Sequence, residues 1–225
     1  QGGTLTLNNC TITDNSGFSG GGIYSMSQLT TINNSTISQN TVSSTGGGIY
    51  AAWELHINGS TISGNTTSNG SSGGIYVGSS FTLIDSTVSD NNALNGDGGG
   101  VVTSFGTAEI TNSTISGNQA RRGGGIHNSV NNMRLTDTRI TGNTSRYDGG
   151  GIYSSMALTL INSTISSNVS SAGNGGGIII FTSPLTVTDS TISSNTSAIS
   201  KGGGIYSGGS SVTLNNSVVS NNGAA

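Results

Sequence analysis

Nine acidic side chains are the groups in this sequence best suited to catalysis. They are Asp14, Glu54, Asp85, Asp90, Asp97, Glu109, Asp137, Asp148 and Asp189. Enzymes that cleave polysaccharides bring several carboxylates together on one face, often with Arg, Lys or Ca²⁺. Only one recurring position holds several acids: Asp85, Asp137 and Asp189 alternate there with Asn112, Asn162 and Asn216. If the intervening segments stack as strands, neighbouring acids lie roughly 9.6 Å apart. Asp replacing Asn at a bend explains this pattern better than a catalytic cluster does.

Metal and cofactor chemistry has little support in the sequence. The two histidines, His56 and His127, occupy different positions of the repeat described below, which argues against a metal pair. No Gly-Gly-x-Gly-x-Asp calcium repeat occurs in the chain. We therefore expect no metal and no cofactor, and no enzymatic activity.

The few charges recur at equivalent positions of successive repeats. Asp97, Arg122 and Asp148 each come just before a glycine run, and Glu109 is followed one repeat later by Arg134. We expect contacts between repeats at both positions, which would fix the register and contribute about 0–1 kcal/mol each at an exposed surface. An anion site built from Arg121, Arg122 and Arg146 is the alternative for the basic residues.

Two further columns of side chains could bind a ligand at the surface. One is an aromatic strip that we expect to point outward: Tyr24, Tyr50, Tyr76, Tyr153 and Tyr206. Such a strip can stack on sugar rings or on itself, and Val102, His127 and Ile179 interrupt it. The other is a Thr-x-Ser strip, as in Thr36 and Ser38. Its hydroxyl rows resemble ice-binding faces, but Thr is also a good strand residue.

Two sequence motifs recur along the chain every 25 to 27 residues. The last glycine of a Gly-Gly-Gly-like triplet falls at Gly22, Gly48, Gly74, Gly100, Gly125, Gly151, Gly177 and Gly204. An asparagine closes a Ser-Thr-Ile-Ser-x-Asn-like segment at Asn15, Asn40, Asn65, Asn91, Asn118, Asn143, Asn168, Asn195 and Asn222. A fixed period of this length indicates a stacked array of coils.

Within one repeat, single apolar residues alternate with polar ones. Leu158 and Leu160 flank Thr159, Ile165 lies between Thr164 and Ser166, and Ile178 follows a glycine triplet. This is strand periodicity, and it predicts three short strands per coil and four aliphatic columns filling one core. We expect the asparagine column to be buried and structural, bonding the backbone of a bend and forming a ladder of stacked amides.

Composition excludes several classes of protein. Only 31% of the 225 residues are hydrophobic and 7% are charged, against about 25% charged in typical domains. Low charge and apolar residues in register argue against disorder and favour a solenoid with a thin core. The net charge of −3 and the lack of basic runs argue against nucleic acid as a partner. The single cysteine, Cys10, excludes an internal disulfide, and no apolar run is long enough to predict a membrane-spanning segment.

Residues 149–168 combine Gly-Gly-Gly-Ile-Tyr with Leu-Thr-Leu-Ile-Asn-Ser-Thr-Ile-Ser-Ser-Asn. This pattern resembles the repeats of bacterial right-handed parallel β-helix surface proteins, which are pectate-lyase-like in fold and related in pattern to polymorphic outer-membrane protein repeats. The resemblance covers essentially the whole chain. It implies secretion and a location outside the cell or at its surface.

These observations predict an all-β protein: one right-handed parallel β-helix domain over residues 1–225, with about nine coils of about 26 residues. Both ends fall within the repeat, so we expect a segment of a longer repeat protein or filament. The expected partners are further coils of the same chain, end-to-end copies, or surface polysaccharide. The expected function is structural or adhesive: a stalk, adhesin shaft or matrix-fibre segment. The alternatives are a carbohydrate-binding or carbohydrate-modifying β-helix, or an ice-binding Thr/Ser face.

Overall fold

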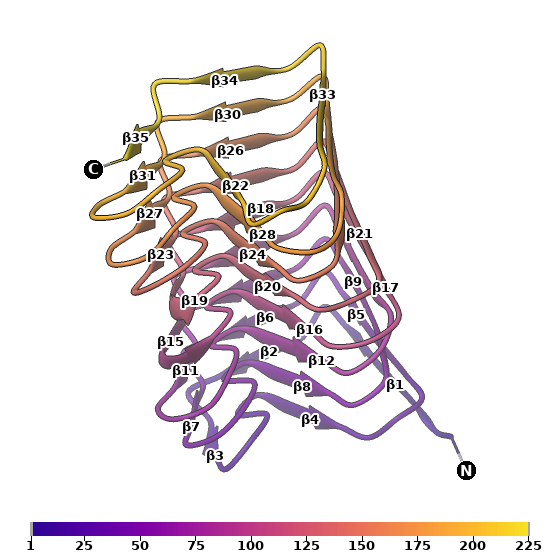
Figure 1. Ribbon diagram of the computed structural model, residues 1–225. Helices are drawn as coiled ribbons and strands as arrows, with labels where there is room; N and C mark the ends of the chain where they lie inside the picture. The colour runs from indigo at the N-terminus through magenta and orange to yellow at the C-terminus, as the bar shows by residue number, and fades with distance from the viewer. Residues whose placement is uncertain (1, 225) are drawn as a thin grey trace.

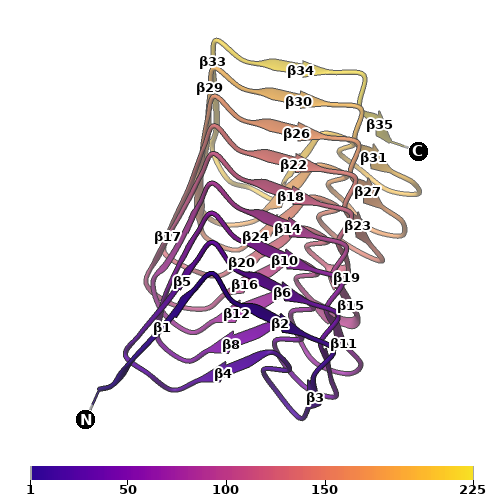
Figure 2. The ribbon, with the colours of Figure 1, turned by 180° about the vertical axis from the view of Figure 1, so that it is seen from behind.

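The chain winds into a rod whose sides are four parallel β-sheets (Figures 1 and 2). The computed structural model describes residues 2–224, and these contain strands, turns and bends but no helix. The ends of the chain lie at opposite ends of the rod (Figure 1). The sequence-based expectation of an all-β parallel β-helix is confirmed.

Each sheet collects the equivalent strand from successive coils. Every strand between the two ends of a sheet pairs with its counterparts one coil before and one coil after. Sheet A contains β1 (Thr4–Asn8), β5 (Leu29–Asn33), β9 (Glu54–Asn58), β13 (Phe81–Ile84), β17 (Thr107–Thr111), β21 (Asn132–Thr136), β25 (Ala157–Ile161), β29 (Leu185–Thr188) and β33 (Val212–Asn215). Sheet B contains β2 (Thr11–Thr13), β6 (Thr36–Ser38), β10 (Thr61–Ser63), β14 (Thr87–Ser89), β18 (Thr114–Ser116), β22 (Arg139–Thr141), β26 (Thr164–Ser166), β30 (Thr191–Ser193) and β34 (Val218–Ser220).

The other two sheets complete each coil. Sheet C contains β3 (Ser16–Gly17), β7 (Thr41–Val42), β11 (Thr66–Thr67), β15 (Asn92–Asp97), β19 (Gln119–Arg122), β23 (Thr144–Ser145), β27 (Val169–Ser170), β31 (Thr196–Ser197) and β35 (Gly223–Ala224). Sheet D contains β4 (Ile23–Ser25), β8 (Ile49–Ala51), β12 (Ile75–Val77), β16 (Val101–Thr103), β20 (Ile126–Asn128), β24 (Ile152–Ser154), β28 (Ile178–Ile180) and β32 (Ile205–Ser207).

A full coil therefore has four strands, and the expectation of three was wrong. The additional strand belongs to sheet C and follows each ladder asparagine. Most of its strands have only two residues, such as Thr144–Ser145, which is too short to show an alternating pattern in the sequence. The described residues form eight coils with all four strands and the first three strands of a ninth.

The four predicted aliphatic columns fill the interior. Ile115 on β18 pairs in register with Val88 on one side and Ile140 on the other, and all three side chains have no exposed surface. Phe81 occupies the first column and is the largest fully buried side chain. Thr30 in the same column stays buried because its hydroxyl donates a 2.7 Å hydrogen bond to Ser25 Oγ.

Two inward columns were not predicted. One is the last residue of the sheet D strands: Ser25, Ala51, Val77, Thr103, Asn128, Ser154 and Ile180. The other lies on sheet C: Val42, Thr67, Ala93, Ala120, Ser145, Ser170 and Ser197. Both columns mix small apolar and polar residues, so hydrophobicity alone does not identify them.

The asparagine ladder lies at the corner between sheets B and C. The members with no exposed surface are Asn40, Asn65, Asn91, Asn118, Asn143, Asn168 and Asn195. Asn118 Oδ1 accepts hydrogen bonds from the backbone N–H and the side-chain amide of Asn91, both at 3.0 Å. Its own amide donates to Asn143 Oδ1 at 2.9 Å and to the Val88 carbonyl at 3.0 Å. The hydrogen-bonding capacity of the amide is therefore fully used.

The ladder differs from expectation in two respects. Asn15 is exposed and Asn222 half-buried, because they belong to the terminal coils. The left-handed residue of the bend is the one before each ladder asparagine, as at Asp90 (φ 56°) and Gly117 (φ 65°). Left-handed geometry therefore does not explain the ladder residue itself; the amide bonds do.

The last glycine of each triplet lies directly against this ladder. Gly123 has a left-handed φ of 61°, which a side chain would strain. A Cβ on Gly125 would lie 2.8 Å from the Gly151 carbonyl oxygen and 3.2 Å from the side chain of Asn143. The last glycine is therefore needed because neighbouring backbone and the ladder approach too closely for any side chain.

A second ladder, of hydroxyl groups, runs along the corner between sheets A and B. The Ser86 N–H donates to Ser113 Oγ at 3.1 Å, and Ser113 Oγ donates to the Thr111 carbonyl at 2.8 Å. The same backbone-to-hydroxyl bond recurs at Ser35, Ser60, Ser163, Ser190 and Ser217. Each of these serines follows an Asn, Asp or Gly and precedes a Thr or Val. The sequence analysis did not assign them a role.

Ile115→Asp is expected to lower the free energy of unfolding by about 4 kcal/mol or more, because it buries an unpaired charge. Ser116→Asp is the matched control, since Ser116 is on the same strand but half-exposed. Urea denaturation followed by circular dichroism measures both. Equal urea midpoints for the two variants would contradict the inward orientation of this column.

Asn118→Ala is expected to lower the free energy of unfolding by about 1–3 kcal/mol for each buried group that loses its hydrogen-bond partner. Asn91, Val88 and Asn143 all lose a bond in this variant. Asn15→Ala, at the exposed end of the ladder, should cost much less. Chemical denaturation of the two variants gives the comparison, and similar losses would show that burial of the ladder contributes nothing.

Candidate functional site: an arginine-lined hollow

The segments that join sheet C to sheet D differ in length. The last glycine follows the ladder asparagine by seven positions from Asn118 to Gly125 and by eight from Asn143 to Gly151. It follows by nine positions from Asn168 to Gly177 and from Asn195 to Gly204. A hollow of about 420 Å³ lies where the short segment meets the longer ones. It is lined by Arg121, Arg122, Tyr147, Asp148, Ala172, Gly173, Asn174 and Ser200.

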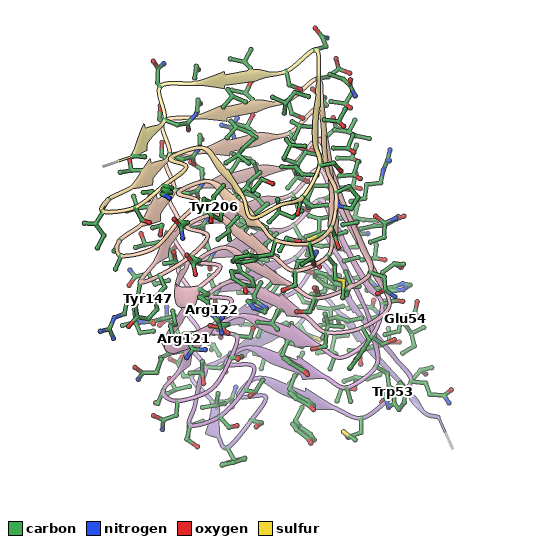
Figure 3. All side chains as sticks on the ribbon, viewed as in Figure 1. Trp53, Glu54, Arg121, Arg122, Tyr147 and Tyr206 are labelled. Carbon is green, nitrogen blue, oxygen red and sulfur yellow. The ribbon has the colours of Figure 1, made fainter. Side chains whose placement is uncertain are left out.

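Asp97 holds the two arginines of this hollow. Arg122 donates from Nε to Asp97 Oδ1 at 3.2 Å and from Nη2 to Oδ2 at 2.9 Å. Arg121 approaches the same two oxygens at 3.1 and 3.3 Å. The Asp97 side chain is 13% exposed, whereas those of Arg121 and Arg122 are 44% and 34% exposed. Both guanidinium groups are thus bonded at one edge, and both side chains remain partly exposed. Figure 3 shows the two arginines beside Tyr147.

The electrostatics follow from this geometry. Burial alone would raise the pKa of Asp97, but the hydrogen bonds from Arg121 and Arg122, with the nearby positive charge, bring it below its usual value. The hydrogen bond to Asp97 raises the pKa of Arg122, opposed by burial and reinforced by the charges of Asp97 and Asp148. Asp97 and Arg122 are therefore both ionised at neutral pH.

Aromatic rings support Arg122 from the side of sheet D. Its guanidinium carbon lies 5.3 Å from the ring centre of Tyr153, and that ring stacks on His127 at 4.7 Å. His127 Nε2 is 3.8 Å from Asp97 Oδ2, and its Nδ1 is buried without a hydrogen bond. Burial lowers the pKa of His127 more than Asp97 raises it, so the ring is neutral near pH 7. His127 therefore acts as a packing residue here.

The other wall of the hollow is tied together by hydrogen bonds between coils. Asp148 Oδ1 accepts the Asn174 backbone N–H at 2.8 Å. Asn174 Oδ1 in turn accepts Ser200 Oγ at 2.7 Å and the Lys201 N–H at 3.2 Å. Tyr147 is 39% exposed, and the guanidinium carbon of Arg146 lies over its ring, 5.2 Å from the ring centre. The hollow is therefore formed by loops that hydrogen bonds join to one another.

The predicted charge contacts are partly confirmed. Asp97 and Arg122 form an ion pair between adjacent coils, with Arg121 as an additional partner. Asp148 bonds Asn174 instead of pairing with Arg122. Glu109 and Arg134 are register partners on β17 and β21, but the salt bridges among residues 2–224 do not include them. Of the three arginines predicted for an anion site, Arg121 and Arg122 meet, whereas Arg146 lies on Tyr147.

The recurring acid position forms a bend. Asp85, Asp137 and Asp189 have φ angles of 49°, 52° and 50°. Each accepts a hydrogen bond from the asparagine of the next coil, such as Asn112 Nδ2 to Asp85 Oδ1 at 2.6 Å. The interpretation of Asp replacing Asn at a bend is confirmed. Among the described residues, no group of three or more His, Cys, Asp or Glu side chains is placed to hold a metal ion.

The tyrosine strip stacks on itself. The ring centre of Tyr50 lies 4.8 Å from that of Tyr24 and 5.0 Å from that of Tyr76, and the ring planes are within 8° of parallel. Burial raises the pKa of Tyr50, and the charges of the neighbouring Tyr76 and Tyr24 raise it further. Stacking covers the ring faces between neighbouring tyrosines, whereas Tyr24, on the end strand of sheet D, is 56% exposed.

The strip is less regular in later coils. Phe181 meets Tyr153 at 52° and Tyr206 at 63°, so these rings pack edge to face. Binding by the strip remains a prediction. On sheet B the Thr-x-Ser hydroxyls bond each other between coils, as Ser166 does to Thr141 at 3.2 Å. The ice-binding alternative also remains a prediction.

Sequence reasoning missed Tyr147, Asn174 and Ser200 as parts of one site. The only signal was the variation in loop length between ladder asparagine and glycine triplet, which does not specify which loops meet. Exposed apolar residues at the corner between sheets D and A were also missed: Met26, Trp53, Phe105 and Met156. Trp53 and Glu54 lie on the side of the rod away from the hollow (Figure 3).

The fold and the ladders define the class of protein: a β-solenoid in which four parallel sheets enclose one aliphatic core. The sequence matches the family described as "Right handed beta helix region" over residues 1–144 and 79–225, which together span the chain. The protein belongs to this family, and the predicted β-helix is confirmed. Searches among curated proteins and solved structures gave no match. Within residues 2–224, no helix has the length and apolar character needed to cross a membrane.

Asp97 should make stability depend on pH. Because its pKa is lowered by folding, its ion pairs stabilise the protein fully above the unfolded-state pKa of about 3.9. That contribution is lost as the pH falls through the lower, folded-state pKa. Asp97→Asn should therefore be less stable than the wild type at pH 5, by about 1–3 kcal/mol for the charge-assisted bonds. The difference should disappear at the lowest pH values.

Urea denaturation between pH 5 and pH 2 tests this expectation. Asp14→Asn is the control, because Asp14 is exposed and lies in the first coil. A gap between wild type and Asp97→Asn that is unchanged down to pH 2 would contradict the assignment.

Proposed function

We propose that the protein is an extracellular β-helix with a structural or adhesive role and no catalytic activity. The observation that carries this proposal is the continuity of the rod. Sheets A, B and C include a strand from every described coil, and sheet D one from each complete coil. The register shifts at a single described strand pair, between Ala93 and Asp97.

Continuity of this kind favours a stiff shaft. Backbone hydrogen bonds run along the axis on all four sides, and the asparagine ladder adds a row inside the core. Bending the rod would stretch the bonds of one sheet while compressing those of the opposite sheet. A shaft or matrix-fibre segment uses this property directly, and further coils or end-to-end copies would extend the same columns.

The state of the acids supports a non-catalytic role. Asp85, Asp137 and Asp189 bond the asparagine of the next coil, and Asp97 bonds two arginines. A general acid or base needs a carboxylate within reach of a substrate and able to exchange a proton. The location outside the cell rests on the resemblance to bacterial surface repeats.

A second candidate is a carbohydrate-binding or carbohydrate-modifying β-helix. The arginine-lined hollow is the observation that favours it, because it combines charged, polar and aromatic groups in one concave site. Binding without turnover fits an adhesive role, whereas turnover would indicate an enzyme.

The purified chain is expected to release no product from pectin, alginate, hyaluronan or neutral glucans. Reducing-end assays and absorbance at 232 nm, which reports unsaturated lyase products, measure this. The proposal also expects unpermeabilised source cells to be labelled by antibodies against the chain. Turnover that is lost in Asp85→Asn, Asp137→Asn or Asp189→Asn would overturn the non-catalytic assignment, and label found only after permeabilisation would overturn the location.

A further inference from the structure

We infer that the arginine-lined hollow binds a sugar unit that carries a carboxylate, as part of an acidic polysaccharide. The inference rests on the proposed adhesive function and gives it a ligand and a place on the rod. Three features of the described residues carry it: the distribution of charge, the free edges of the two arginines, and the mixed polar and aromatic lining.

Basic residues are concentrated around the hollow. Of the six Lys and Arg residues in the chain, Arg121 and Arg122 line it, and Arg146 and Lys201 directly adjoin lining residues. The acids in the same region are Asp97 and Asp148, so the local formal charge is about +2. The rest of the chain has two basic and seven acidic residues, since the totals are six and nine. An anionic ligand is therefore attracted to this region and repelled by most of the remaining surface.

Asp97 prepares the arginines for a second carboxylate. It bonds Nε and Nη2 of both guanidinium groups, and neither Nη1 group makes a hydrogen bond within the described residues. The Tyr153 ring under Arg122 further restricts that side chain. Two fixed donor groups at the edge of a hollow suit a planar carboxylate, and little side-chain freedom is lost on binding.

The remaining lining suits the sugar ring. Asp148 accepts its hydrogen bonds on Oδ1, so Oδ2 can accept a sugar hydroxyl. Ser200 and Asn174 add polar groups beside it, and the partly exposed Tyr147 ring can contact the apolar face of a sugar. The volume of about 420 Å³ lies in the range of small-ligand sites, and the hollow opens on the outside of the rod, where a polymer can pass.

The stacked tyrosines do not compete for this role. Their faces contact one another, and no basic residue lies beside Tyr24, Tyr50 or Tyr76 on sheet D. The hollow is the place where an aromatic ring, paired guanidinium groups and free acceptors meet.

Isothermal titration of the full chain with trigalacturonate tests the inference. Binding is expected at low salt and should weaken as the salt concentration rises. Galactotriose, which has the same ring without the carboxylate, should bind at least about tenfold more weakly, and so should trigalacturonate to Arg121→Gln. Arg139→Gln is the matched control: it removes an exposed arginine on sheet B, outside the hollow, and should leave binding unchanged. Circular dichroism establishes that each variant is folded.

The outcomes separate the inference from the proposed function. No binding to wild type, equal binding of galactotriose, or equal loss in Arg121→Gln and Arg139→Gln would each overturn the acidic-sugar site and leave the structural role standing. Inorganic sulfate binding as tightly as trigalacturonate would also overturn it, because the sugar ring would then contribute nothing. Binding accompanied by cleavage would support the site and overturn the non-catalytic assignment.

Discussion

The separation of neighbouring strands in a parallel sheet, about 4.8 Å, governs the rest of this structure. At that distance the main neighbour of any side chain is the equivalent side chain one coil away. A residue type can therefore form a column only if it packs or bonds with itself. Isoleucine does so through shape, asparagine through an amide that both donates and accepts, and tyrosine through its ring faces.

Charged side chains cannot satisfy this condition, because like charges one coil apart repel each other. Where charges occur, they alternate with a partner of another kind: Asp97 with Arg122, and Asp85 with Asn112. The arginine-lined hollow arises where the loops change in length from coil to coil. The regular columns hold the rod together, and its chemically distinctive surface lies where the repetition fails.

Most of the fold could be predicted from the sequence because each aliphatic column repeats eight or nine times with little change. Ile115 and Asn118 were placed in the interior from period and polarity alone. The fourth strand could not be predicted, because two residues such as Thr144 and Ser145 show no periodicity. The hollow could be predicted only in part. Asp97 and Arg122 share a repeat position in the sequence, but Tyr147, Asn174 and Ser200 come from loops whose paths depend on tertiary contacts.

The alternating bend of Asp85, Asn112, Asp137 and Asn162 also sets a chemical limit on the lifetime of the rod. Slow hydrolysis converts asparagine amides to carboxylates in ageing proteins. At Asn112 this would replace the 2.6 Å bond to Asp85 with two facing carboxylates, one of which would have to take up a proton. Hydrolysis at one bend would thus also remove a hydrogen bond from the adjacent coil. An old rod should loosen along this corner first, while the aliphatic columns, which have no hydrolysable side chains, remain chemically unchanged.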